Sequence, residues 1–301
     1  MSDPVIRTHG LTKHYGKSRG IVGLDLEVDP GEIFGYLGPN GAGKTTTIRL
    51  LLDLIRPTEG RAEVFGLDSH GGGLAIRHRV GYLPGELRLY GSVSALELFS
   101  YFGHLRHRFD PADTARIAEA LDLDTTREIR TLSHGNRQKV GLVQALMGRP
   151  EIVILDEPTQ GLDPFVQQTF YRLLDEVRAD GRTVFMSSHV LPEIERTCDR
   201  VAIVREGRLL AVERVADLKA RAMRRLELRF AAPLPAGSFA DVGGVRDVVV
   251  DGSTVTCTVA GPVAALFRAA SAFDLVDVVS SEPGLEEIFL AYYGDAGDAA
   301  A

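Results

Sequence analysis

Residues 38–45 read Gly-Pro-Asn-Gly-Ala-Gly-Lys-Thr and match the pattern G-x-x-x-x-G-K-[ST]. The preceding residues, Ile33–Leu37, are mostly apolar and predict a short buried strand, and Lys44–Leu54 carries apolar side chains on one face of a predicted helix. A strand, a glycine-rich turn and a helix in this order are the setting in which the pattern forms a phosphate-binding loop. The stretch therefore predicts an α/β protein that holds a nucleotide by its phosphates.

The chemistry of this loop follows from its residue types. Glycines let the backbone curl so that several N–H groups point at phosphate oxygens, and the helix N-terminus adds partial positive charge. The Lys44 ammonium suits the β- and γ-phosphates, and the Thr45 hydroxyl suits Mg²⁺. The alternative is an accidental glycine-rich turn, which we expect in on the order of one such chain in a hundred. The residues that we assign to ATP in this stretch are Gly38, Pro39, Asn40, Gly41, Ala42, Gly43, Lys44, Thr45 and Thr46.

Two adjacent carboxylates, Asp156 and Glu157, follow the apolar run Ile152–Leu155. Ligands of open parallel sheets bind at the carboxyl ends of the strands, which is where this pair is predicted to lie. Asp156 suits Mg²⁺, directly or through water, and Glu157 suits the role of polarising the water that attacks the γ-phosphate. Alone, an acidic pair after a strand is more often a turn or a helix cap. Together with residues 38–45 it predicts ATP hydrolysis.

The composition restricts the class of protein. The chain has 301 residues, 45% apolar and 25% charged, and a net charge of −7, which is typical of a globular protein of about two domains and argues against nucleic acid as a partner. Its apolar runs are far shorter than the roughly 20 residues of a membrane-spanning helix. The N-terminus lacks the pattern of a secretory signal, and Cys198 and Cys257 are predicted to be buried thiols. We therefore expect a cytoplasmic location.

The pattern of strands and helices predicts two domains. In residues 1–218, short apolar strands alternate with amphipathic helices, which predicts a nucleotide-binding domain around a largely parallel sheet. Within it, residues 92–146 are mostly helical in pattern and predict a helical subdomain, with a helix starting at Asp110-Pro111. Residues 219–301 predict a small α+β accessory domain, whose tail at 294–301 contains only Gly, Ala and Asp and is expected to be disordered.

Further segments resemble the ATP-binding cassette (ABC) proteins. Thr131–Gln138, which contains Leu-Ser-His-Gly-Asn, resembles the LSGGQ signature of that family and opens a predicted helix ahead of Ile152. Gly161-Leu162-Asp163 looks like the D-loop of the family, His189 looks like its switch histidine, and Tyr15 lies near the position of the aromatic residue that stacks on adenine. A lone histidine or tyrosine is usually structural, but the ordered set covers about 200 residues of the chain and is very specific.

The resemblance implies a fold and a set of roles. The fold is a P-loop NTPase core of ABC type with a helical subdomain, and the cofactors are ATP and Mg²⁺. His189 joins Glu157 as a catalytic residue, and Ser133 and Gly135 of the signature face phosphate. The chain departs from the family in having His134 and Asn136 within the signature. It also has Gly85-Glu86 where the Q-loop glutamine is expected, and Glu86 is a candidate replacement for that glutamine.

The segment Pro283–Leu290 resembles the end of ATPases that serve ABC-2-type exporters, including the daunorubicin-resistance type. This match is shorter than the others, and a generic amphipathic helix is the alternative. Where it holds, it implies export of drugs, lipids or other hydrophobic compounds.

The family resemblance also implies partners. In ABC proteins two nucleotide-binding domains stack head to tail, so the phosphate-binding loop of one meets Ser133 and Gly135 of the other. This chain has one G-x-x-x-x-G-K-[ST] pattern, so we expect a homodimer that binds two ATP molecules. We also expect a separately encoded transmembrane permease, docked on residues 92–146, which holds the subunit at the inner face of the cell membrane.

Three other functions are weighed against transport. ABC-type ATPases of DNA repair or chromosome organisation carry a long coiled coil between the two halves of the site, and no heptad insertion occurs here. Translation-factor relatives carry two cassettes in tandem. A nucleotide-binding regulator without catalysis would not need both Glu157 and His189. Transport is therefore the predicted function.

Overall fold

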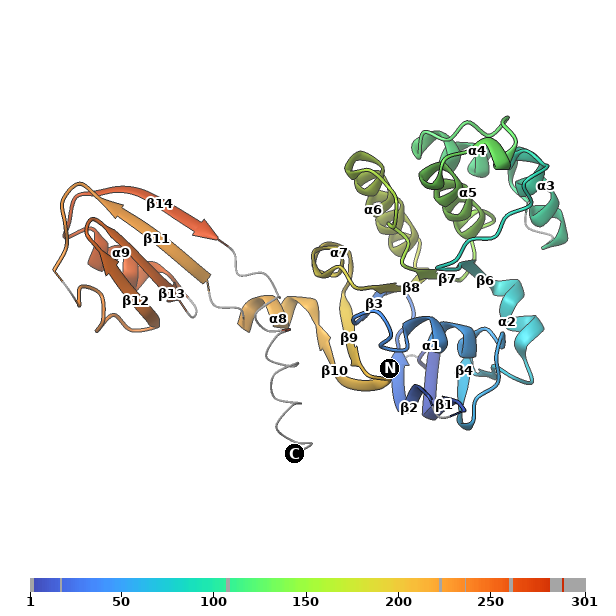
Figure 1. Cartoon of the computed structure of the whole chain (residues 1–301), viewed down its shortest axis with the longest axis horizontal. Helices are drawn as coiled ribbons and strands as arrows, with labels where there is room; N and C mark the ends of the chain where they lie inside the picture. The colour runs from blue at the N-terminus through green and yellow to red at the C-terminus, as the bar shows by residue number, and fades with distance from the viewer. Residues whose placement is uncertain are drawn as a thin grey trace. The chain divides into compact units, whose positions relative to one another are not determined.

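The computed structural model describes residues 3–16, 18–106, 109–221, 224–235, 237–259 and 262–281, together with Phe289. The chain divides into two compact units, Met1–Glu213 and Arg214–Ala301 (Figure 1). The boundary predicted from the sequence lies slightly later, between 218 and 219. The segment 283–290, apart from Phe289, and the tail at 294–301 lie outside the described residues.

The first unit begins with an antiparallel sheet of order β2-β1-β4-β5. This sheet was not predicted from the sequence, where these residues were assigned to the alternating α/β pattern. Only Gly16 and Lys17 separate the first two strands, and a connection this short joins antiparallel strands but not parallel ones. The strands are β1 (Ile6–Tyr15), β2 (Ser18–Val28), β4 (Glu59–Val64) and β5 (Leu67–Asp68).

A second sheet of order β10-β9-β3-β8-β7-β6 carries the parallel strands. The strand β3 pairs in parallel with β8 and β9, and β7 pairs in parallel with β6 and β8. Every residue of β3, β7 and β8 is buried, as expected where both faces of a parallel sheet are covered. The bounds are β3 (Ile33–Leu37), β6 (Val80–Leu83), β7 (Ile152–Asp156), β8 (Thr183–Ser188), β9 (Arg200–Arg205) and β10 (Arg208–Arg214).

Helices cover the parallel sheet on both sides. The helix α1 packs against β4 and β7, between the two sheets, whereas α5 packs on β6 and β7 and α6 packs on β8 (Figure 1). Residues 92–146 contain α3, α4, a short 3₁₀ turn (Ile129–Thr131) and α5. The helix start predicted at Asp110-Pro111 is confirmed, because Asp110 caps α4 and Pro111 is its first residue. The bounds are α1 (Lys44–Leu51), α2 (Gly73–Arg79), α3 (Ala95–Leu105), α4 (Pro111–Ala120), α5 (His134–Leu146), α6 (Pro164–Ala179) and α7 (Leu191–Thr197).

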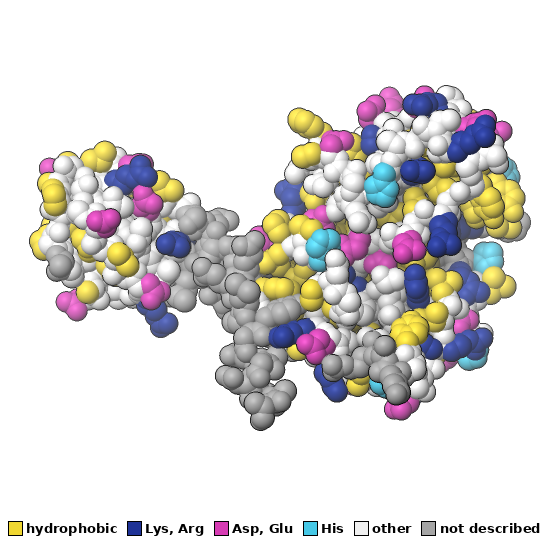
Figure 2. Space-filling view, in the orientation of Figure 1, with side chains coloured by type: hydrophobic (Ala, Val, Ile, Leu, Met, Phe, Trp, Pro, Cys, Tyr) yellow, Lys and Arg dark blue, Asp and Glu magenta, His cyan; other side chains and the backbone are white. Residues whose placement is uncertain are grey.

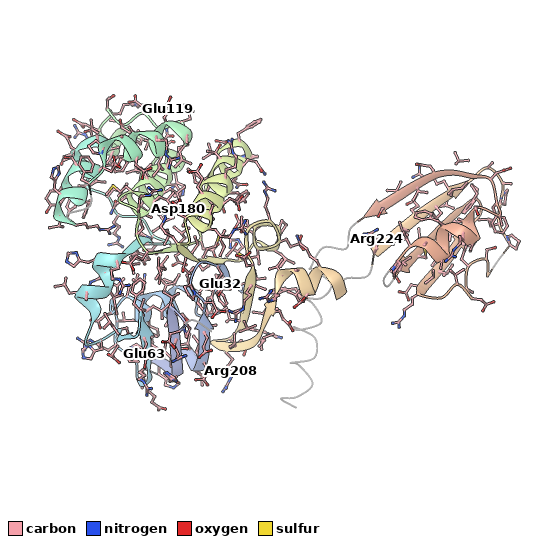
Figure 3. The ribbon with its side chains drawn as sticks, turned by 180° about the vertical axis from the view of Figure 1, so that it is seen from behind. Glu32, Glu63, Glu119, Asp180, Arg208 and Arg224 are labelled. Atoms are coloured by element: carbon pink, nitrogen blue, oxygen red, sulfur yellow. The ribbon has the colours of Figure 1, made fainter. Side chains whose placement is uncertain are left out.

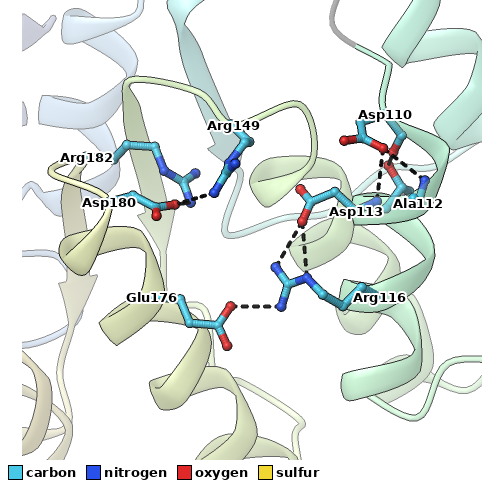
Figure 4. A network of polar contacts seen from close by, with 9 residues as sticks. Asp110, Ala112, Asp113, Arg116, Arg149, Glu176, Asp180 and Arg182 are labelled. Carbon is cyan, nitrogen blue, oxygen red and sulfur yellow. Dashed lines mark hydrogen bonds and ion pairs between the residues drawn. The ribbon is translucent and has the colours of Figure 1, made fainter.

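An ion pair connects α4 to α6 on the surface of this unit (Figure 4). Arg116 pairs with Asp113 at 3.0 Å on its own helix and with Glu176 of α6 at 2.8 Å. The Arg116 and Glu176 side chains are about half exposed, so the link between the helices contributes at most about 1 kcal/mol. The attachment of α4 to α6 through the Arg116–Glu176 pair is therefore easily broken.

The second unit contains a four-stranded antiparallel sheet of order β12-β13-β11-β14. The helix at 264–270 contributes to the same apolar core as this sheet. The apolar cluster of this unit contains Leu226, Leu228, Val255 and Leu266 and no residue of the first unit. Figure 3 labels Arg224, at the start of β11, and Arg208, at the start of β10 in the first unit. The bounds are α8 (Val215–Arg221), β11 (Arg224–Phe230), β12 (Val245–Asp251), β13 (Thr254–Val259), α9 (Ala264–Ala270) and β14 (Leu275–Ser281).

Both cysteines are buried free thiols, as predicted. Burial raises the pKa of Cys198 to about 12, so its thiol stays protonated and unreactive. Among the described residues, no helix has the length and hydropathy that a membrane crossing requires.

Candidate nucleotide-binding site

The phosphate-binding loop joins the end of β3 to the start of α1. Gly43 caps α1 with φ at +100°, and a Cβ atom there would lie 2.6 Å from Cγ2 of Ile21. Only glycine satisfies both the backbone angle and the close approach. Lys44 follows with 6% of its surface exposed, and its Nζ donates to the carbonyl oxygens of Gly38 at 2.6 Å and Pro39 at 3.2 Å. The loop thus curls around its own lysine.

Asp156 lies at the end of β7 and is fully buried. Its Oδ2 accepts a hydrogen bond from the Thr45 hydroxyl at 2.6 Å, and its Oδ1 accepts one from the Ser187 hydroxyl at 2.5 Å. The structure therefore brings together the two side chains predicted to hold a metal ion. Ser187 was missed from the sequence, although a serine ending the apolar run Thr183–Met186 is a signal of a polar role.

Glu157 has a left-handed backbone conformation, with φ at +51°. This conformation costs a residue with a side chain on the order of 1 to 3 kcal/mol and is enriched at active sites. The Glu157 N–H donates to the Ser187 carbonyl at 3.2 Å, which holds the turn. The bend directs the carboxylate of Glu157 to the same edge of the sheet as Lys44 and His189.

The Glu157 carboxylate contacts both of those side chains. His189 Nδ1 donates to its Oε2 at 2.7 Å. Its Oε1 lies 3.1 Å from Lys44 Nζ and, among the described residues, accepts no hydrogen bond of good geometry, so that contact is ionic. The two residues predicted to be catalytic, Glu157 and His189, are thus paired in the structure.

A cavity of about 240 Å³ opens beside the loop. Tyr15 stands at its edge with 46% of its surface exposed and its ring against Gly20, where a Cβ atom would lie 3.0 Å from Cε2 of the tyrosine. Gly20 lines the cavity and, like Ser187, was not predicted from the sequence. The cavity is lined by Tyr15, Gly20, Asn40, Gly41, Gly43, Lys44, Thr45, Thr46 and Glu157.

The signature residues lie elsewhere in the chain. The Ser133 hydroxyl accepts from the Asn136 N–H at 3.3 Å and caps α5. A Cβ atom at Gly135 would lie 2.6 Å from the carbonyl oxygen of Gly161, so α5 begins in contact with the loop at 161–163. Neither signature residue lines the cavity beside Lys44. The structure therefore does not bring Ser133 and Gly135 to the phosphate-binding loop of the same chain.

Glu86 was a candidate replacement for the Q-loop glutamine. Its side chain is 80% exposed and lines a separate cavity of about 610 Å³, together with His134 and Arg137. The neighbouring Gly85 lies against the metal-binding carboxylate, since a Cβ atom there would be 3.1 Å from Oδ2 of Asp156. The structure thus places the backbone at Gly85, and not the Glu86 side chain, beside Asp156.

The side chains present fit a magnesium ion. Mg²⁺ prefers oxygen ligands and is held by one or two protein groups together with waters and phosphate oxygens. The Thr45 hydroxyl and the Asp156 carboxylate supply such a pair, 2.6 Å apart. Among the described residues there is no cluster of three or more His, Cys, Asp or Glu side chains that would hold a metal ion by itself.

Fold and site together define a P-loop nucleotide-binding protein, with the loop after one parallel strand and the Asp-Glu pair after another. Residues 21–160 match the family model described as ABC transporter. The chain is 37% identical to the bacitracin transport ATP-binding protein of Bacillus licheniformis over 228 residues, which cover 75% of this chain and 74% of that protein. It is 36% identical to a daunorubicin resistance ATP-binding protein of Streptomyces coeruleorubidus over 309 residues, covering 98% of each.

Solved structures agree with these relatives. An ATP-binding subunit of an ABC transporter superposes with a TM-score of 0.66 at 27% identity, over 71% of this chain and 92% of that one. A dimeric bacterial ABC transporter cassette superposes with a TM-score of 0.65 at 23% identity, over 70% and 98%, and supports the fold. The chain belongs to the ATP-binding subunits of the ABC transporter family, which confirms the predicted family and fold class. Membership in this family implies ATPase activity.

Proposed function

We propose that this chain hydrolyses ATP to drive an ABC exporter whose membrane-spanning part is a separate protein. The observation that carries the proposal is the contact of one carboxylate, Glu157, with both Lys44 at 3.1 Å and His189 at 2.7 Å. A phosphate-binding lysine, a carboxylate and a histidine converge there beside a cavity lined by the phosphate-binding loop. This arrangement suits transfer of a phosphoryl group to water.

Each side chain has a separate part in the proposed reaction. Backbone N–H groups of residues 38–43 and the Lys44 ammonium bind the phosphates, and Tyr15 stacks on the adenine. Thr45 and Asp156 would hold Mg²⁺, which neutralises phosphate charge when bound. Glu157 is the general base, because its carboxylate lies beside the phosphate-binding lysine at the edge of the cavity. His189 orients Glu157 through the hydrogen bond from Nδ1.

A second copy of the chain completes the site in this proposal. Ser133 and Gly135 lie outside the cavity that contains Lys44, so they serve a nucleotide only on another molecule. A relative of the same fold is a dimeric cassette. We therefore propose a head-to-tail homodimer that closes on two ATP molecules and opens after hydrolysis.

The proposed permease contact lies on the helical segment 92–146. Hydrophobic side chains gather over α3 on the surface of the first unit (Figure 2), and Leu96, Tyr101 and Leu105 of this helix are exposed. Exposed apolar groups on one helix are typical of a protein interface. Docking there would hold the subunit on the inner face of the membrane. The names of the relatives favour export of drugs or other hydrophobic compounds, the class that we propose for this transporter.

The direct test is ATP hydrolysis by the purified chain with Mg²⁺, compared with the Lys44→Ala variant. The variant should lose hydrolysis and bind ATP far more weakly, because the substitution removes a buried charge that meets the phosphates. It should still fold, since Lys44 belongs to the site and not to the apolar core. Circular dichroism checks the fold. Equal turnover in the two proteins would refute the proposed ATPase site.

A further inference from the structure

Glu193 is a buried carboxylate that the proposed reaction does not use. It lies on α7 with 5% of its surface exposed, and both of its oxygens accept hydrogen bonds. The Thr159 hydroxyl donates to Oε1, and the Ser188 hydroxyl donates to Oε2 at 2.7 Å. A buried carboxylate is costly unless its oxygens are satisfied in this way. An apolar side chain at position 193 would fill the same space without that cost, so the core alone does not explain a glutamate there.

The two hydroxyl groups belong to different segments of the chain. Thr159 comes two residues after Glu157, on the loop that follows β7. Ser188 comes directly before His189, at the end of β8. One carboxylate thus joins the loop that carries the general base to the strand end that precedes its histidine partner.

The sheet does not hold these segments together by itself. The pairing of β7 with β8 ends at Asp156 and Ser187. Beyond that pair, backbone contact between the strands continues only as far as Glu157, whose N–H donates to Ser187. The hydrogen bonds of Glu193 lie further out, where the two chains separate, and they close the gap between them.

Thr159 and Ser188 are buried, but Glu157 and His189 border open space on one side. A cavity of about 490 Å³ lies on this side of the Glu157–His189 pair, lined in part by Glu157, His189, Glu193, Tyr171 and Arg196. Close-packed neighbours resist movement, whereas a loop that borders open space does not. The hydrogen bonds of Glu193 therefore add to packing in fixing the separation of the two segments at this point.

The Glu157–His189 pair acts electrostatically on Glu193. Burial raises the pKa of the Glu193 carboxyl and the charge of Glu157 adds to that effect, while the hydrogen bonds from Thr159 and Ser188 and the charge of His189 lower it. The three side chains form one electrostatic group behind the phosphate-binding loop.

We propose that Glu193 is a positioning residue for hydrolysis, and that its bonds to Thr159 and Ser188 hold Glu157 and His189 at hydrogen-bond distance. The claim deepens the proposed ATPase function and rests on it for its effect on turnover. A general base works only within hydrogen-bond reach of its proton, and a displacement of about 1 Å can cost on the order of a hundredfold in rate. Nucleotide binding does not depend on this link, since Glu193 does not line the cavity beside Lys44.

The test compares Glu193→Ala and Glu193→Gln with the wild-type chain. Glu193→Ala should lower turnover at saturating ATP by about 10- to 100-fold and leave the affinity for ATP within about threefold. Glu193→Gln keeps one acceptor and adds a donor for the second hydroxyl, so it should retain most of the activity. Equal loss of turnover in both variants, or none in Glu193→Ala, would overturn the proposal. So would a loss of ATP affinity that matches the loss of rate.

Thr197→Val is the matched control on the same helix. Its hydroxyl donates to the Glu193 carbonyl at 2.6 Å and is buried, so the change weakens α7 without touching either segment. It should lower the melting temperature and leave turnover close to the wild-type value. If Thr197→Val slows hydrolysis as much as Glu193→Ala, the role of Glu193 is structural only and the proposal fails.

A second readout does not depend on turnover. Nuclear magnetic resonance of the ¹⁵N-labelled histidine rings reports the bond from His189 Nδ1 to Glu157, with His189→Asn identifying the signal. Glu193→Ala, or Thr159→Val if that chain does not fold, should shift this signal, and Thr197→Val should not. A wild-type chain without ATPase activity would refute the proposed function, and the histidine signal would still decide the role of Glu193.

Discussion

Tyr15 is a side chain of the candidate site with few contacts to the rest of the chain. Nearly half of its surface is exposed, and its ring rests on Gly20 and near the Lys13 ammonium, 5.5 Å from the ring centroid. Such a ring has a face available for a base, and it adds little to the core. Its contribution should therefore be to affinity and not to folding.

Tyr15→Ala should weaken ATP binding by about 1 to 3 kcal/mol, the usual contribution of a base stacked on an aromatic ring. Turnover at saturating ATP should change less, because the phosphate contacts remain. Titration calorimetry measures the affinity, and Tyr90→Ala is the control, since Tyr90 is exposed and lines a different cavity. A Tyr15→Ala protein that loses thermal stability but keeps its affinity would place Tyr15 in the core instead.

At this scale the sequence predicts which side chains serve the site but not how they are held. Lys44, Thr45, Asp156 and Glu157 follow from two motifs, because the motifs encode phosphate and metal chemistry directly. The bond from Ser187 to Asp156 depends on the register between β7 and β8, which no local pattern specifies. The backbone strain at Glu157 is equally invisible, since glutamate has no preference for a positive φ.

At the scale of elements, the start of α5 and the loop at 161–163 form one packed joint. Gly135 has the Gly161 carbonyl against it, and His134 covers Gly161, where a Cβ atom would lie 2.6 Å from Cδ2 of the histidine. The segment that resembles the family signature therefore touches the segment that resembles the D-loop within the chain. Movement of one segment must be accompanied by movement of the other.

Gly135→Ala tests this joint. Alanine favours a helix over glycine by about 0.5 to 1 kcal/mol, but the added Cβ would lie 2.6 Å from a backbone oxygen, and such overpacking costs about 1 to 3 kcal/mol. The cost of the clash should exceed the gain in helix propensity. We therefore expect a lower free energy of unfolding in urea and slower hydrolysis, with ATP binding retained. Gly71→Ala is the control, because its nearest neighbour would be 4.0 Å away. A Gly135→Ala chain as stable and as active as wild type would show that the two segments can separate without loss of stability or activity, which would contradict the prediction.

The elements predicted from the sequence are mostly those that carry strong apolar patterns. The strands Ile33–Leu37 and Val80–Leu83 agree with the structure residue for residue, since buried parallel strands are continuous apolar runs. The antiparallel sheet of β1, β2, β4 and β5 was missed, because strands such as Glu59–Val64 are largely exposed and carry polar residues. Helix ends were less certain, and α1 ends at Leu51 and not at Leu54.

At the scale of the whole molecule, nucleotide chemistry belongs to the first unit. Every residue that lines the cavity beside Lys44 lies before Glu213, and the second unit has its own apolar cluster. We propose that residues from Arg214 onward form an accessory domain that supplies no ligand to the nucleotide. A single chain still lacks one part of the proposed site, because Ser133 and Gly135 lie outside that cavity.

Glu157→Gln separates binding from chemistry and tests whether two chains share a site. Glutamine keeps the size of the side chain but is no carboxylate base, so turnover should fall by about 10²- to 10⁴-fold. Lys44, Thr45 and Asp156 are unchanged, and ATP should bind almost normally. If a second chain completes each site, ATP then accumulates a closed dimer that hydrolysis no longer opens. Light scattering at high protein concentration, with and without Mg-ATP, measures the dimer, and Glu157→Gln combined with Lys44→Ala should stay monomeric. Hydrolysis at the wild-type rate would remove Glu157 from its role as the base. An inactive protein that binds ATP and remains monomeric even beside its permease would refute the shared site.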